Sequence, residues 1–176
     1  MSNHGRKKNR EVIENKEQLL YAQFREESDR GLVLLAGATL DILLRDLLAA
    51  FLVDDEHEVD ALLGTEDNPD TPLGSFAARI KAAYCLGFLT GRRRNNLTLI
   101  RKIRNHFAHQ LHGGSFEVDP VRGWCNALDL SEDEGQPESI RWRFLYAYID
   151  LEVDLKSQTQ EALEQRRTVL EEYHPE

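Results

Sequence analysis

Arg104, Asn105 and His109 stand within six residues of one another, and their side chains suit acid–base chemistry on a phosphodiester. A His, whose ordinary pKa is near neutral, can accept the proton of a ribose 2′-hydroxyl. An Arg guanidinium can hold the phosphate while negative charge develops on it. The trio therefore predicts metal-independent RNA cleavage as one interpretation. The other is a solvated helix face, in which a His near the helix C-terminus interacts favourably with the helix dipole.

The segment around this trio is expected to be a helix over residues 92–111 that ends at Gly113 and Gly114. One apolar stripe, predicted to face the core, consists of Ile100, Ile103, Phe107 and Leu111. Arg104 lies about 40° from Ile100 on the helical wheel. It therefore needs a partner or a cleft to remain charged. The opposite face is polar, is expected to line a groove, and consists of Thr98, Lys102, Asn105 and His109.

Charge is distributed unevenly along this chain of 176 residues, whose net charge is −9. The 46 residues from Thr71 to Phe116 contain eight Lys or Arg residues and no Asp or Glu. The other 130 residues hold the remaining 14 Lys and Arg residues and all 31 Asp and Glu residues. This asymmetry indicates either an anionic partner or pairing with acidic helices of this chain or another subunit. The candidate nucleic-acid-binding residues are Arg92, Arg93, Arg94, Arg101 and Lys102.

Metal, cofactor and disulfide chemistry are not indicated. His106 and His112 are close to His109, but no carboxylate or Cys is near them in sequence, so we expect no metal and no cofactor. Cys85 and Cys125 are too few for a disulfide framework or a zinc site. Because both have apolar neighbours, we expect both to be buried in a reducing compartment. Four aromatic residues could stack on bases but at these spacings more often pack in a core or interface: Trp124, Trp142, Tyr146 and Tyr148.

The sequence predicts a cytoplasmic protein without membrane contact. The basic run near Met1 is not followed by the apolar region of a secretory signal. The most apolar stretch, residues 31–53, contains Asp41, Arg45 and Asp46. It is therefore expected to be a buried core helix and not a membrane span.

The hydrophobic periodicity predicts an all-α, single-domain helical bundle over residues 11–176, preceded by a flexible basic arm over residues 1–10. Ser28 or Asp29 is the expected N-cap of the second helix, and Ser75 that of the fourth. Arg79 and Lys81 are expected on the polar side of their helix. The second half of the last helix is polar and is expected to project from the core or pack on a partner. The expected helices span residues 11–27, 30–53, 58–63, 76–86, 92–111, 122–128 and 139–173.

Residues 27–130 resemble the mannitol operon repressor (MltR) family. The most specific pieces are the Pro-Leu-Gly at 72–74 and the Arg-Asn-His-Phe-Ala-His at 104–109, with further likeness at residues 27–31 and 79–81. The family is all-helical and is named for repression of a sugar-alcohol operon. It is similar in outline to the wider HEPN group of helical domains, whose motif is an Arg, a polar residue and a His four to six residues after the Arg. Arg104, Asn105 and His109 match that motif. In HEPN ribonucleases two such motifs meet across a dimer, so the resemblance implies a homodimer.

Two functions follow as hypotheses. The first is a regulatory protein of the MltR type, which acts in transcriptional regulation mainly through protein contacts. The sequence shows no helix-turn-helix with a basic recognition helix, so unaided operator binding is not expected. The second is a HEPN-type metal-independent endoribonuclease, a toxin or defence component that cuts RNA with Arg104 and His109. The expected partners are a second copy of the chain, another protein, and RNA or DNA.

Overall fold

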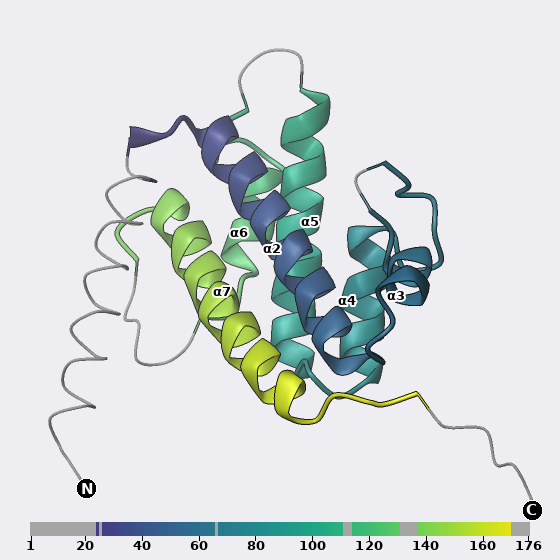
Figure 1. Ribbon diagram of the computed structural model, residues 1–176. Helices are drawn as coiled ribbons and strands as arrows, with labels where there is room; N and C mark the ends of the chain where they lie inside the picture. Colours follow the sequence, from purple (N-terminus) through teal and green to yellow (C-terminus); the bar gives the residue numbers. More distant parts are fainter. Residues whose placement is uncertain (1–23, 25, 66, 111–113, 131–136, 170–176) are drawn as a thin grey trace, which may run out of the picture.

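The computed structural model describes residues 24, 26–65, 67–110, 114–130 and 137–169, and most of these lie in helices (Figure 1). The described residues contain no strand, so the predicted all-α class is confirmed. The predicted basic arm over residues 1–10 and most of the predicted helix 11–27 lie outside the described residues. The helices are α2 (Asp29–Phe51), α3 (Glu56–Leu63), α4 (Phe76–Cys85), α5 (Gly91–His109), α6 (Val121–Asn126) and α7 (Ile140–Glu164).

Helix α2 is the centre of the bundle and packs against α7, α5, α4 and α3. It runs parallel to α7, since Arg141 pairs with Asp29 at the start of α2 and Arg167 lies over the Phe51 ring at its end (Figure 1). It runs antiparallel to α5, because Arg30 of α2 donates to the backbone carbonyl of Gln110, just after α5 ends. The apolar stretch at 31–53 is thus a core helix, as predicted.

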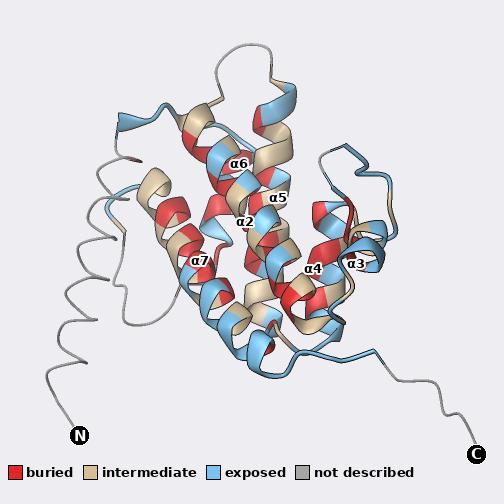
Figure 2. Ribbon diagram, viewed as in Figure 1, coloured by how far each residue is buried: buried red, intermediate tan, exposed pale blue. Residues whose placement is uncertain are grey.

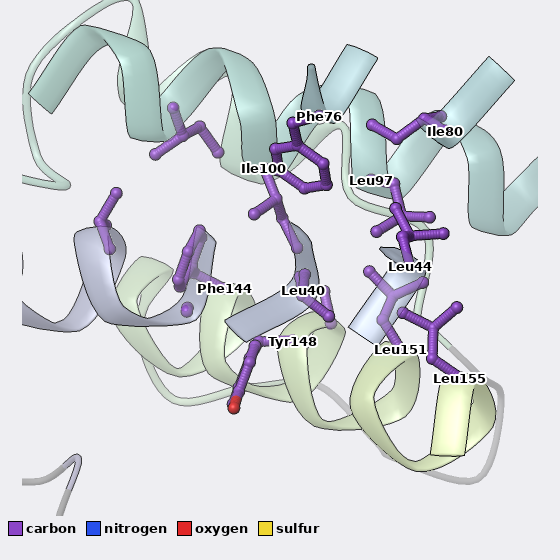
Figure 3. Close-up of a cluster of buried hydrophobic side chains, with 14 of the residues drawn as sticks. Leu40, Leu44, Phe76, Ile80, Leu97, Ile100, Phe144, Tyr148, Leu151 and Leu155 are labelled. Atoms are coloured by element: carbon purple, nitrogen blue, oxygen red, sulfur yellow. The ribbon is translucent and has the colours of Figure 1, made fainter. Parts of the chain in front are cut away.

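The core is a single cluster of apolar side chains between α2, α4, α5 and α7 (Figures 2 and 3). Leu40 and Leu44 of α2 project into it, and Tyr148 and Leu151 of α7 close it from the other side (Figure 3). The Leu-rich composition of α2 explains this position, because a helix that is apolar around most of its circumference needs partners on several sides. No helix among the described residues is long and apolar enough to cross a membrane.

Side-chain caps fix where all the described helices except α6 begin. The Ser28 hydroxyl accepts from the Gly31 N–H, and Ser75 accepts from Ala78. Ser75 was predicted as a cap, and Ser28 is one of the two alternatives, Ser28 or Asp29, predicted for its helix. Both satisfy backbone donors that have no partner within the helix. The helix that contains the Arg104 motif is capped by Thr90, whose side chain accepts from the Arg93 N–H.

The structure corrects three expectations. Arg79 is not on a polar face but buried, because its guanidinium donates to Asp41 and to the carbonyls of Leu63 and Leu73.

The second correction concerns the last helix, which ends at Glu164 and does not extend towards Tyr173, although residues 170–176 lie outside the described part.

The third correction concerns the cysteines. Cys85 is exposed at the end of α4, whereas Cys125 is fully buried on α6. Burial raises the pKa of the Cys125 thiol to about 12, so this Cys is a small core side chain as expected. The prediction that Cys85 is buried rested on its apolar neighbours in sequence and is wrong. The position of a residue around the helix, and not the type of its neighbours, decides which way its side chain points.

Candidate functional site

Helix α5 carries the candidate site, and its inner face is fixed to the core. Ile100, Ile103 and Phe107 are fully buried, so this part of the predicted apolar stripe faces the core, while Leu111 lies outside the described residues. Near the start of the helix the Asn96 side chain donates to the Asp129 carbonyl and accepts from the Asp129 N–H. These contacts hold α5 at both the α2 side and the α6 side, so its outer face has a fixed orientation.

An open groove lies along α5 beside α6 and has a volume of about 440 Å³. His106 contributes an aromatic wall, since its ring centroid is 5.8 Å from that of Trp124 at an interplanar angle of 82°. A hydrogen bond of 3.1 Å between His106 Nε2 and Gln110 Nε2 fixes the imidazole. We call this feature the α5–α6 groove, and its lining residues are Lys102, Asn105, His106, His109, Gln110 and Trp124.

The groove is therefore formed by only part of the polar face that the sequence predicted. Lys102, Asn105 and His109 come together as the sequence indicated. They are joined by His106, which the sequence suggested only as a metal ligand, and by Gln110, which no sequence motif indicated. Trp124 was expected in a core or interface, and it is half-buried against His106. Gln110 follows His109 and lies four positions after His106, so helical spacing could have indicated that it joins this face. No sequence signal places α6 beside α5.

Arg104 lies on the other side of α5 and does not line the groove. Its aliphatic stem packs on Gly37 of α2, where an added Cβ would stand 2.6 Å from Arg104 Cγ. Its Nη1 donates to Asn105 Oδ1 at 3.0 Å. This is the partner that a charged side chain so near the core requires. Because Arg104 and His109 are five positions apart, they point about 140° apart on the helix.

Two of the candidate nucleic-acid-binding residues are engaged inside the protein. Arg92 pairs with Asp150 at 3.3 Å and Arg93 with Asp154 at 2.7 Å, both on α7. Burial raises the pKa of the Asp154 carboxyl, and the nearby Arg93 guanidinium partly opposes this shift. Pairing with the chain's own acidic helix, one of the two interpretations of the basic window, therefore accounts for these two arginines.

The remaining cations form a different surface. Arg94 stacks on the Tyr84 ring, with its Cζ 4.5 Å from the ring centroid. Among the described residues no carboxylate pairs with Arg94, Arg101, Lys102 or Arg104. We call Arg94, Arg101 and Lys102, which share the polar face of α5, the cationic strip; Arg104 points about 160° away from Lys102 on the helix. Lys102 belongs to both the strip and the α5–α6 groove.

The chemistry available at this surface is anion binding and proton transfer. Lys102 and His109 are exposed, and the Asn105 side chain offers an amide beside them. Within the described part of the chain, no three His, Cys, Asp or Glu side chains come together as candidate metal ligands. The groove therefore presents cationic, amide and aromatic groups without a carboxylate.

Comparison with known proteins shows what fold this is. One chain of the X-ray structure of the MtlR–HPr complex from Escherichia coli is similar, with a TM-score of 0.54 and 17% sequence identity over 79% of this chain and 92% of that chain. No family model matches the sequence, and no curated protein sequence matches it. The structural likeness supports an MtlR-like helical fold, which the resemblance to the mannitol operon repressor family predicted.

Proposed function

We propose that this chain is a regulatory protein of the MtlR type, which acts in transcriptional regulation by binding a protein partner. The observation that carries the proposal is the likeness of fold over 92% of a chain from the MtlR–HPr complex. MtlR is bound to HPr in that structure, so the partner proposed here is an HPr protein. The absence of a helix-turn-helix in the sequence supports action through protein contacts.

The outer face of α2 suits a protein contact. Leu35 is 42% exposed and Ile42 is 58% exposed, although α2 is the central helix of the bundle. Ala38, also exposed, lies between them on the same helix face. We call Leu35, Ala38 and Ile42 the outer α2 stripe. Large apolar side chains that stay exposed side by side on one face are typical of interaction surfaces.

The test is isothermal titration calorimetry of the purified chain with HPr from the same organism. We expect saturable binding that Ile42→Asp weakens at least about tenfold, because a buried anchor at the centre of an interface is typically worth more than about 1.4 kcal/mol. The matched control is Val153→Asp on the outer side of α7, where Val153 is 51% exposed. Absence of binding to HPr would contradict the proposed partner. Equal loss from both variants would contradict the proposed surface.

The α5–α6 groove favours the endoribonuclease as a second candidate. It brings His109 and Asn105 beside Lys102, the groups that proton transfer and phosphate binding require. Arg104 is held away on Gly37, so one copy of the chain does not place Arg104 and His109 on a common phosphate. Cleavage would need Arg104 from a second copy. The regulator therefore remains the better supported function.

A further inference from the structure

No carboxylate among the described residues forms an ion pair with the cationic strip. Neither α4 nor α5 contains an Asp or Glu, so the nearest helix along the chain cannot neutralise it. The strip extends from Arg94 to Lys102, about 12 Å along the helix axis. Three positive charges at this spacing attract a ligand with several negative charges more strongly than a single small anion.

The strip lacks the apolar anchors of a protein interface. Such interfaces depend on a few large apolar or aromatic side chains that become buried at their centre. None of the large apolar side chains that are exposed in the described part of the chain belongs to α5. The nearest, Tyr84, already stacks under Arg94. A polyanion therefore suits this surface better than a folded acidic protein.

The α5–α6 groove adds a site for a planar ring at the side of the strip. The Trp124 and His106 rings supply an aromatic wall, and the amides of Asn105 and Gln110 can hydrogen-bond to a base edge. Its volume of about 440 Å³ gives a base room to enter. Lys102 connects the groove to the strip, so a base in the groove would have its phosphate beside cations. A base stacked and paired within a duplex cannot enter.

We propose that the cationic strip and the α5–α6 groove together bind single-stranded nucleic acid, with phosphates on Arg94, Arg101 and Lys102 and a base in the groove against Trp124. This surface is distinct from the outer α2 stripe, and the proposal does not depend on cleavage or on HPr binding. Nucleic acid and a protein partner would occupy different faces of the bundle.

The experiment measures fluorescence anisotropy of labelled single-stranded RNA and DNA 12-mers with the full-length chain between 20 and 200 mM salt. Arg101→Ser and Lys102→Ser should each weaken binding roughly three- to tenfold at low salt. Each should also reduce the slope of log affinity against log salt by about 0.7, the value for one phosphate contact on a single strand. The matched control is Arg122→Ser, which removes one exposed positive charge from the start of α6.

A second readout reports on the groove. In a Trp142→Phe background the only tryptophan is Trp124, and its fluorescence should be quenched when a single strand binds. A circular-dichroism melt establishes that this background is folded.

No binding at 20 mM salt, equal weakening by Arg122→Ser, or an unchanged Trp124 signal on binding would each overturn the proposal. Equal affinity for a duplex would overturn the single-strand assignment. Equal affinity for polyglutamate would assign the strip to an acidic protein.

Discussion

At the scale of single residues, Arg104 connects the motif to the core. Its stem lies on Gly37, and its guanidinium donates to Asn105. A side chain with these contacts stabilises the α2–α5 packing as well as contributing charge. His109 is exposed and lines the α5–α6 groove, and its ring makes no hydrogen bond within the described residues. The two motif residues therefore differ in structural importance, which makes their variants informative.

Substitution of the motif separates a structural role from a catalytic one. We expect purified protein to leave mixed RNA intact in EDTA, Arg104→Ala to lower the melting temperature, and His109→Ala to leave it nearly unchanged. The measurements are gel analysis of RNA, including its end groups, and thermal unfolding followed by circular dichroism. Cleavage that leaves 2′,3′-cyclic phosphate, and that either variant abolishes by a hundredfold or more without loss of fold, would establish the endoribonuclease instead.

Gly37 tests the close contact directly. An alanine there gains about 1 kcal/mol of helix propensity, but its Cβ would stand 2.6 Å from Arg104 Cγ and 3.0 Å from Arg104 Cβ. We expect Gly37→Ala to destabilise the fold by roughly 1–3 kcal/mol, the usual cost of overpacking. In an Arg104→Ala background the same change should cost less, because the Cγ atom is gone. A double-mutant cycle in urea measures this coupling. Strictly additive effects would show that the contact is unimportant.

At the scale of helices, the sequence predicted inner faces well and polar contacts between helices poorly. The apolar stripe of α5 and the caps Ser28 and Ser75 follow from local spacing and side-chain chemistry, and both were confirmed. Arg79 was misplaced because its burial depends on Asp41, 38 residues away, and on two loop carbonyls. No local pattern encodes such distant partners.

The candidate site shows the same limit. Lys102, Asn105 and His109 share one helix face, so their proximity could be predicted. Trp124 comes from α6, and its place beside His106 depends on how α6 packs on α5. The pairing of Arg92 and Arg93 with α7 likewise depends on helix packing. The composition of the basic window, residues 71–116, indicated that its cations require negatively charged partners. It did not indicate which of these cations pair with carboxylates of this chain.

The contact between α5 and α7 has a pH dependence with a definite sign. Because burial raises the pKa of Asp154 above the ordinary value of 3.8 for this side chain, the folded state binds this proton more tightly than the unfolded state. The stability that Asp154 contributes is fully present below pH 3.8 and is lost as pH rises through its folded pKa. We therefore expect the free energy of unfolding of the wild type, relative to Asp154→Asn, to fall across that window.

Urea unfolding of the two proteins between pH 3.5 and pH 7 measures this difference, and Arg93 remains charged throughout that range. Subtracting one curve from the other removes the titration of the other carboxyl groups. A difference that increases with pH would mean that the Arg93 guanidinium, and not burial, dominates the pKa of Asp154.

At the scale of the whole molecule, two faces of the bundle have different chemistry. The outer α2 stripe is apolar, while the outer face of α5 is cationic and free of carboxylates on its own helix. We propose, from the resemblance of residues 104–109 to the HEPN motif, a homodimer in which the two α5 helices meet. Such a dimer brings two cationic strips together, so its subunits repel each other until salt or a polyanion screens the charge.

We therefore expect a dimer whose association strengthens as salt rises, the opposite of nucleic-acid binding. Sedimentation equilibrium of the 20.2 kDa chain at 50 and 500 mM salt measures this, with Ile42→Asp as a control that should leave association unchanged. The Debye length falls from about 14 Å to about 4 Å over this range, so repulsion between strips is largely removed. Association that weakens with salt would indicate contact through opposite charges elsewhere. A monomer at micromolar concentration at both salts would contradict the dimer and, with it, the only arrangement that supplies Arg104 to His109.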